Sequence, residues 1–268
     1  MLFEQYWHMS RNPFDKSLPA RDAFATRDFR EATSRLEFLA RAGGIGLVTA
    51  PPGAGKTYAI RAWSASLNPN SASHVYVCLS TVSPVEFYRQ LCQGLGIEPA
   101  YRKSDMFRQV QEHLRYRSVD KGLQTVVTLD EAQYLSHEIL RDLKMLANFD
   151  MDSRDCVAIV LAGQPVLADV LSRTAHEALA QRVVVSYAFR GIAADEAAPY
   201  VEALLRGAGA SPAIFEPAAV AAAHGCCNGS VRRLNQVLTG ALRIGAQQRA
   251  ASVDAEMVLS ASQEASLR

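Results

Sequence analysis

A glycine-containing segment at residues 50–57, APPGAGKT, combines residue types that bind phosphate groups. It matches the pattern GxxxxGK[ST], except that Ala50 stands in place of the first glycine. The glycines allow backbone N–H groups to turn inward, and a helix starting at the end of the segment would add the positive end of its dipole. An adjacent lysine and hydroxyl would neutralise the β and γ phosphates and bind Mg²⁺, so we expect ATP and Mg²⁺ here. The predicted ATP-binding residues are Pro52, Gly53, Ala54, Gly55, Lys56, Thr57 and Tyr58, with Lys56 also catalytic and Thr57 also a magnesium ligand.

Two adjacent carboxylates follow an apolar run further along the chain. The run TVVTL ends at Leu129, and Asp130 and Glu131 come directly after it. Open α/β sheets bind their ligands at the carboxyl ends of strands, so these side chains are expected beside the phosphate loop. We predict that Asp130 holds Mg²⁺ and that Glu131 orients and deprotonates the attacking water.

Short apolar runs alternate with amphipathic helical stretches, which is typical of a parallel α/β sheet. The predicted strands are Ile45–Thr49, Val75–Leu79, Leu123–Leu129, Cys156–Leu161 and Val183–Tyr187. The predicted helices between them are Asp28–Ala42, Thr57–Leu67, Pro84–Gly94, Asp105–Arg117 and His137–Asn148. After about residue 190 the pattern is helical only, over residues 193–206, 216–224, 230–249 and 254–265.

Length and charge limit the classes of protein to consider. The 268 residues are enough for one large domain or a core with an appendage, and we expect a nucleotide-binding domain at 1–190 and a helical domain at 191–268. The 28 basic and 27 acidic residues give a net charge of +1, so any polyanion must be bound by a local patch. The purest apolar run, Cys156–Ala162, is too short to cross a membrane, and the sequence indicates a cytoplasmic protein without a membrane partner.

With these motifs the chain resembles the AAA+ ATPases of the ExeA/TniB type, a group that includes transposition regulators similar to TnsC, MuB and IstB. Four further strings carry the resemblance: the opening aromatic cluster ending in Asn12-Pro13-Phe14, DEAQ at 130–133, LAGQP at 161–165 and GSVRRLN at 229–235. The resemblance implies a P-loop, RecA-like parallel sheet flanked by helices, a small C-terminal helical lid, and ATP sites completed by a neighbouring subunit of a ring or helical filament.

The resemblance also implies roles for individual residues. Gln164 looks like the polar sensor of the γ-phosphate, although it also suits a polar loop before Pro165. Arg182 resembles the arginine that reaches into the adjacent subunit's site, and a simple helix-ending arginine is the alternative. Arg232 looks like the second sensor, which couples the lid to the nucleotide, with Arg233 as its rival because the helical register is open there.

The stretch from Tyr101 to Lys121 is the most basic part of the sequence. It carries six Lys and Arg against three Asp and Glu, a local balance of +3. We predict that Arg102, Lys103 and Arg108 bind the phosphate backbone of double-stranded DNA, and that oligomerisation repeats the patch into a track. The alternative is the solvated face of an amphipathic helix.

Three functions fit these features. The first is an ATP-dependent, oligomeric DNA-binding regulator that binds target DNA and recruits or stimulates a transposase. The second is an ExeA-like ATPase that assembles a secretion machine, a role for which we would expect a membrane span and a wall-binding segment. The third is a nucleotide-gated switch with little turnover, which the presence of Lys56, Asp130 and Glu131 disfavours. We favour the first.

Overall fold

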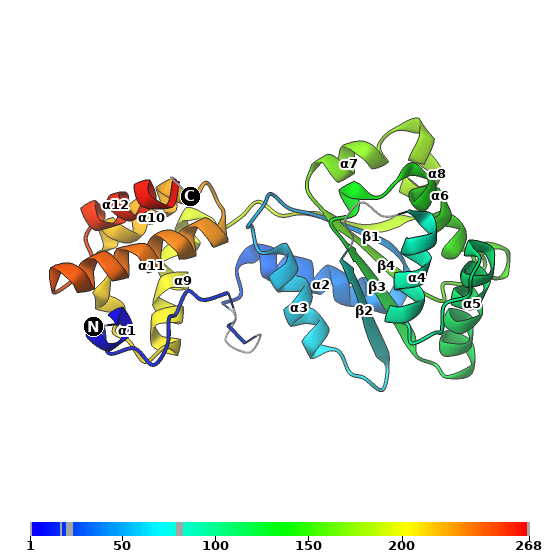
Figure 1. Cartoon of the computed structure of the whole chain (residues 1–268), viewed down its shortest axis with the longest axis horizontal. Helices are drawn as coiled ribbons and strands as arrows, with labels where there is room; N and C mark the ends of the chain where they lie inside the picture. Colours follow the sequence, from blue (N-terminus) through cyan, green and yellow to red (C-terminus); the bar gives the residue numbers. More distant parts are fainter. Residues whose placement is uncertain (1, 17, 20–23, 79–82, 267–268) are drawn as a thin grey trace. The chain divides into compact units, whose positions relative to one another are not determined.

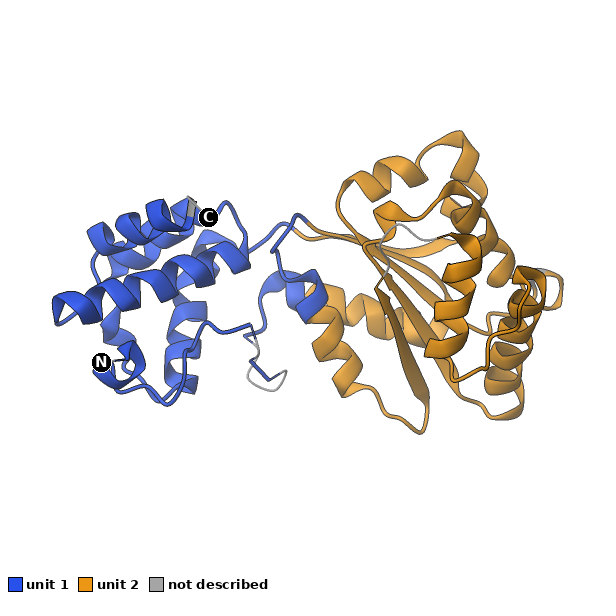
Figure 2. Cartoon of the chain, viewed as in Figure 1, with its two compact units in different colours: residues 1–30, 51–58, 190–268 blue, residues 31–50, 59–189 orange. Residues whose placement is uncertain are grey.

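The computed structural model describes residues 2–16, 18, 19, 24–78 and 83–266. It divides into two compact units, which Figure 2 distinguishes by colour. Unit 1 comprises residues 1–30, 51–58 and 190–268, and unit 2 comprises residues 31–50 and 59–189. The expected helical domain at 191–268 falls entirely within unit 1. Unit 1 also contains the N-terminal segment and the phosphate loop, which we expected to group with the nucleotide-binding domain.

Unit 2 is built on a sheet of five strands in the order β2-β3-β4-β1-β5, and each pair of neighbours is parallel (Figure 1). Thr49 pairs with Gly163 and Cys78 pairs with Asp130, so the carboxyl ends of four strands meet at one edge. The strands are β1 (Gly44–Thr49), β2 (Ala72–Cys78), β3 (Gln124–Asp130), β4 (Ala158–Gly163) and β5 (Val183–Ala188).

The sequence predictions of the α/β fold and of all five strands are confirmed. The three central strands are buried along almost their whole length, which explains why they read as continuous apolar runs rather than as alternating ones. The first three residues of β2 were missed because its polar start breaks the apolar run, and Leu79 lies outside the described residues.

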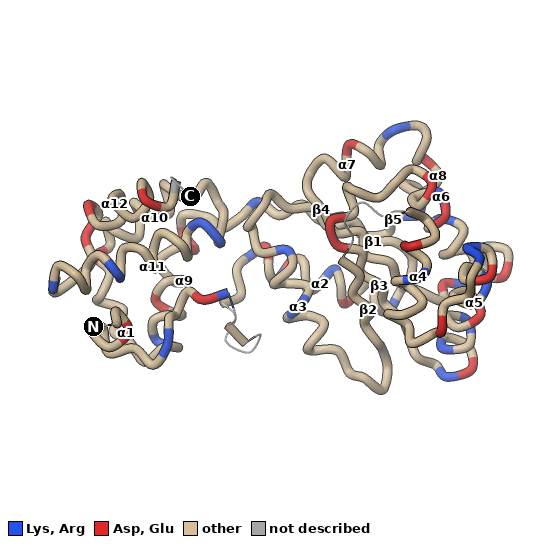
Figure 3. Tube along the Cα trace, viewed as in Figure 1, with Lys and Arg blue, Asp and Glu red and all other residues tan. Residues whose placement is uncertain are grey.

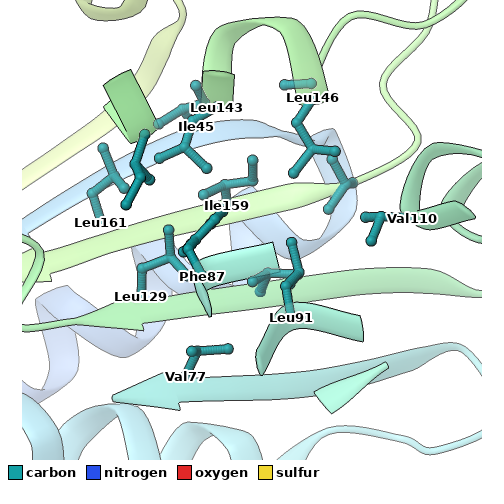
Figure 4. Packing of buried hydrophobic residues seen from close by; sticks show 14 of the residues in the cluster. Ile45, Val77, Phe87, Leu91, Val110, Leu129, Leu143, Leu146, Ile159 and Leu161 are labelled. Carbon is teal, nitrogen blue, oxygen red and sulfur yellow. The ribbon is translucent and has the colours of Figure 1, made fainter. Parts of the chain in front are cut away.

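A large apolar core lies between one face of this sheet and helices α4, α5 and α6 (Figure 4). Leu91 of α4, Val110 of α5 and Leu143 of α6 are buried in it against strand residues such as Leu129 and Ile159. The helices of unit 2 that follow β2 are α4 (Pro84–Gly94), α5 (Lys103–Arg115), α6 (His137–Leu146), α7 (Val166–Leu171) and α8 (Glu177–Ala180). A π-helical turn at Tyr116–Asp120 follows α5.

Helices α2 (Arg27–Ala42) and α3 (Lys56–Ser66) pack against the other face of the sheet. Position 46 in β1 requires glycine, because a Cβ there would lie 2.5 Å from a methyl group of Leu39 in α2. Trp63 of α3 makes an edge contact with His74 of β2, with ring centroids 5.4 Å apart.

Unit 1 has a separate apolar core formed by the lid helices and the N-terminal segment. Trp7 is buried there, and its indole N–H donates to the carbonyl oxygen of Leu242 at 2.9 Å. Phe14 packs edge-on against Phe215. The opening aromatic cluster therefore belongs to the lid. The helices of unit 1 are α1 (Phe3–Tyr6), α9 (Ala194–Gly207), α10 (Pro217–Cys227), α11 (Val231–Gln248) and α12 (Ala255–Ser266). Within the described residues of both units, no helix has the length and apolar character needed to cross a membrane.

Candidate nucleotide site

The phosphate loop has the backbone conformation that its glycines predict. Gly53 and Gly55 have φ values of +80° and +103°, in the left-handed region that favours glycine, and α3 begins at Lys56. A Cβ on Gly55 would meet no heavy atom of the described residues within 4 Å, so the loop is open at this point. A loop of this shape at a helix N-terminus fits a phosphate group.

Ala50, which replaces the first glycine of the motif, is accommodated without strain. It lies outside the left-handed region, so its Cβ carries no conformational penalty. Its N–H donates to the carbonyl oxygen of Gly163 at 3.0 Å, which ties the end of β1 to the end of β4.

The phosphate loop also contacts the start of the long lid helix α11 within unit 1. The backbone N–H of Arg232 donates to the carbonyl oxygen of Gly53 at 3.0 Å. A Cβ on Gly53 would collide with Ser230 Oγ and would lie 2.9 Å from Arg232 Cβ. Gly53 is thus required both for its φ angle and for close approach of the lid. Arg233 Nε donates to the carbonyl oxygen of Cys226 at 2.8 Å, whereas Arg232 contacts the loop through its backbone N–H.

Unit 1 also contains an aromatic pair at the start of α3 and a buried carboxylate. Tyr58 packs against Phe29, with ring centroids 6.4 Å apart. The carboxylate of Asp28 accepts hydrogen bonds from the backbone N–H groups of Arg190 and Gly191, at 2.9 and 2.7 Å. Only 6% of Asp28 is exposed, so these bonds fix the segment that leads from β5 to α9.

In unit 2 the two predicted carboxylates lie at the carboxyl end of β3. Asp130 is 2% exposed, and its Oδ2 accepts a hydrogen bond of 2.6 Å from the Tyr76 hydroxyl on β2. Burial, together with the hydrogen bond and the charge of Asp130, raises the pKa of Tyr76 far above its usual value. The carboxylate of Asp130 and the hydroxyl of Thr57 are oxygen donors, which suit Mg²⁺.

Glu131 has an unusual backbone conformation and a specific side-chain partner. Its φ is +55°, in the left-handed region that costs free energy for a residue with a Cβ. Gln133 Nε2 donates to Glu131 Oε2 at 2.7 Å, and Gln133 Oε1 accepts from the backbone N–H of Gln164 at 3.1 Å. The structure thus brings the predicted base and the predicted sensor together through a third residue.

Arg182 lies at the amino ends of the strands, opposite the end of the sheet that carries Asp130 and Glu131. Its carbonyl oxygen accepts from the N–H of Ile45 at the amino end of β1, whereas Asp130 and Glu131 lie at the carboxyl edge. At about 3.3 Å per residue, the six residues of β1 separate these edges by roughly 16–20 Å, farther than an arginine side chain reaches.

Comparison with known proteins identifies a domain family and related folds. Residues 40–171 match the sequence model of the AAA domain, a span that begins before β1 and ends with α7. The chain is an ATPase. A curated relative is general secretion pathway protein A of Aeromonas hydrophila, which is 27% identical over 246 residues. The match covers 90% of the ATPase but only 44% of the relative's length.

Solved structures share the fold of the ATPase. Cdc6p from Pyrobaculum aerophilum superposes with a TM-score of 0.73 at 18% identity, covering 94% of this chain and 70% of that one. The Aeropyrum pernix ORC1 protein, solved in complex with DNA, gives 0.63 at 18% identity and covers 97% and 69% of the two chains. The branch migration motor RuvB of Thermotoga maritima gives 0.57 at 13% identity, with 94% and 73% covered.

Two of the three predicted DNA-binding residues of the ATPase, Lys103 and Arg108, lie close to carboxylates. Lys103 Nζ lies 2.8 Å from Glu138 and 2.6 Å from Asp142, and these hydrogen bonds outweigh burial and raise the pKa of Lys103. Arg108 lies 3.6 Å from Asp105. Figure 3 shows basic and acidic residues interleaved along α5. Carboxylates from α6, distant in the sequence, thus offset part of the local +3 balance, while Arg102 at the N-cap is exposed.

Two residues of the site had no predicted role. Gln133 is the last residue of the DEAQ string, two residues after Glu131. This short distance from the predicted base was the signal that could have indicated a role in the site. Tyr76 is brought to Asp130 only by the pairing of β2 with β3, which the sequence does not reveal.

Proposed function

We propose that the ATPase binds ATP through the phosphate loop and hydrolyses it. Lys56 neutralises the phosphates, Arg232 senses the nucleotide from the lid, and Gln164 contacts the γ-phosphate or the attacking water. Glu131 takes the proton of that water. Thr57 and Asp130 hold Mg²⁺, which reduces the negative charge on the phosphates when it is bound.

The site is completed in trans by Arg182 of a neighbouring copy in a homo-oligomer. The observation that carries this proposal is the position of Arg182 at the amino edge of the sheet, too far from Glu131 to act in the same subunit. A guanidinium from a neighbour would stabilise the charge that develops during phosphoryl transfer.

Mixing of inactive variants tests the shared site. Arg182→Ala should lose turnover yet retain nucleotide affinity in the monomer, and mixing it with Lys56→Ala should partly restore activity. Arg41→Ala removes an exposed arginine of unit 2 that pairs only with Glu37 among the described residues, so it serves as the matched control and should keep parental turnover. Absence of recovery at every mixing ratio would contradict a site shared between subunits.

We further propose that the oligomer is a cytoplasmic regulator of transposition that binds double-stranded DNA and engages a transposase. The motifs resemble such regulators, and the solved structures with this fold include the DNA-bound ORC1 protein of Aeropyrum pernix and Drosophila ORC bound to DNA. The cationic residues available for DNA include Arg102, whereas Lys103 would first have to exchange its carboxylate partners.

The similarity to general secretion pathway protein A favours a second candidate, an ATPase that assembles a secretion machine. Binding of duplex DNA separates the two. The regulator should bind duplexes of any sequence, more strongly with ATP, and its affinity should fall steeply with salt because bound phosphates release counterions. No binding at low salt with ATP would exclude the regulator and leave the secretion candidate.

A further inference from the structure

Gln133 makes two hydrogen bonds that join the end of β3 to the end of β4. Its amide N–H donates to the carboxylate of Glu131, and its carbonyl oxygen accepts from the backbone N–H of Gln164. Both groups of one amide are therefore used, one on each strand end. Gln133 lies in a 3-10 turn at Ala132–Tyr134, directly after Glu131, and this short turn fixes its position relative to the carboxylate.

Glu131 needs such support because its backbone is strained. A positive φ at a residue with a Cβ costs of order 1–3 kcal/mol and persists only when the surroundings fix it. Besides the bond from Gln133, the N–H of Glu131 donates to Asp130 Oδ1 at 2.9 Å. This second bond holds the backbone of Glu131, whereas the bond from Gln133 acts on the carboxylate that would carry out the chemistry.

Gly163 shows that the space around Gln133 is closely packed. A Cβ at position 163 would lie 2.6 Å from Gln133 Oε1 and 2.9 Å from a methyl group of Leu167. The backbone of β4 therefore approaches the amide as closely as the lack of a side chain allows. An amide with few alternative positions fixes the carboxylate it holds.

We propose that Gln133 is a positioning residue of the ATPase, which holds the carboxylate of Glu131 at a fixed place relative to the end of β4 that carries Gln164. The inference rests on the proposed role of Glu131 as the base that activates water. Gln133 itself contacts no reacting atom; it acts by orienting Glu131. Loss of its amide should therefore slow the chemical step and leave ATP binding unchanged.

Three variants test the inference. Gln133→Met keeps the size of the side chain and removes both hydrogen bonds. Gln133→Glu keeps an oxygen acceptor for Gln164, removes the donor to Glu131 and places a second carboxylate beside it, so it should displace the Glu131 carboxylate at least as strongly as Gln133→Met. Gln111→Met is the matched control, because Gln111 is a glutamine of unit 2 whose amide N–H donates instead to the carbonyl oxygens of Met145 and Asn148.

We expect kcat to fall about 10- to 100-fold in both Gln133 variants, which is the rate equivalent of one hydrogen bond to a charged group, with KM for ATP unchanged. The control should keep the parental kcat. Single-turnover rates of Glu131→Ala and Glu131→Ala/Gln133→Met should be equal, since a residue that acts only through Glu131 has no effect once Glu131 is gone.

Two results would overturn the inference while the role of Glu131 stands. One is an unchanged kcat in Gln133→Glu, and the other is an additive loss in the double variant, which indicates a structural contribution. A different result, parental turnover in Glu131→Gln, would show that Glu131 is not the base. That outcome would remove the proposed mechanism itself, and with it the role of Gln133.

Discussion

Alanine substitution at Gly53 and at Gly55 separates two effects on the phosphate loop. One is the cost of a positive φ, and the other is the cost of a side chain that meets the lid helix α11. Gly53→Ala and Gly55→Ala both put a Cβ on a residue with positive φ, which costs about 1–2 kcal/mol in each case. Both also restrict the unfolded chain to the same extent, so that contribution cancels when they are compared. The difference between the two variants therefore reports their surroundings in the folded state.

Those surroundings differ sharply within unit 1. At Gly55 the new Cβ meets none of the described residues, whereas at Gly53 it collides with Ser230 Oγ and lies 2.9 Å from Arg232 Cβ. Overpacking of this kind costs about 1–3 kcal/mol. We expect the free energy of unfolding to fall by about 1–2 kcal/mol in Gly55→Ala and by about 2–5 kcal/mol in Gly53→Ala.

Urea denaturation without nucleotide, followed by far-ultraviolet circular dichroism, measures both values. Ser230→Ala supplies the third arm, because it removes the colliding oxygen. In that background the additional cost of Gly53→Ala should shrink, although Ser230→Ala itself loses the N-cap bond to Arg233, a loss of about 1 kcal/mol. Equal destabilisation by the two glycine variants would refute the contact between the loop and the lid helix.

Three further predictions concern residues outside the phosphate loop. Burial lowers the pKa of His74 from its usual 6.5 to about 4, so folding favours the neutral ring. The contribution of this ring to stability is present above pH 6.5 and is lost as the pH falls from 6.5 towards 4. Urea midpoints between pH 7 and pH 4.5 should show this loss, and His74→Gln should reduce it; identical pH profiles would contradict it. Lys103→Ala should lower the free energy of unfolding by up to about 1 kcal/mol, because it leaves Glu138 and Asp142 without their cation; an unchanged urea midpoint would show that these pairs contribute nothing. Asp28→Ala should lower the free energy of unfolding by about 1.5–3 kcal/mol, and with it the melting temperature, because two backbone N–H groups after β5 lose a buried charged acceptor. A melting temperature equal to the parent's would show that these two hydrogen bonds do not stabilise the fold.

The sequence determined the elements and the motifs of this protein, because both depend on residues close together in the chain. Apolar runs marked the five strands, and glycines with an adjacent lysine and threonine marked the phosphate loop. The carboxylates after β3 followed from the same local pattern.

Tertiary structure decided which of these groups meet. Pairing of β2 with β3 brings Tyr76 to Asp130, and the approach of β3 to β4 allows Gln133 to join Glu131 to Gln164. The positive charge of residues 101–121 is partly offset in the folded protein, because α6 brings two carboxylates to Lys103. The aromatic N-terminus packs into the core of the lid, more than 200 residues away in the sequence. Each of these contacts joins segments that only folding brings together, so no local pattern encodes them.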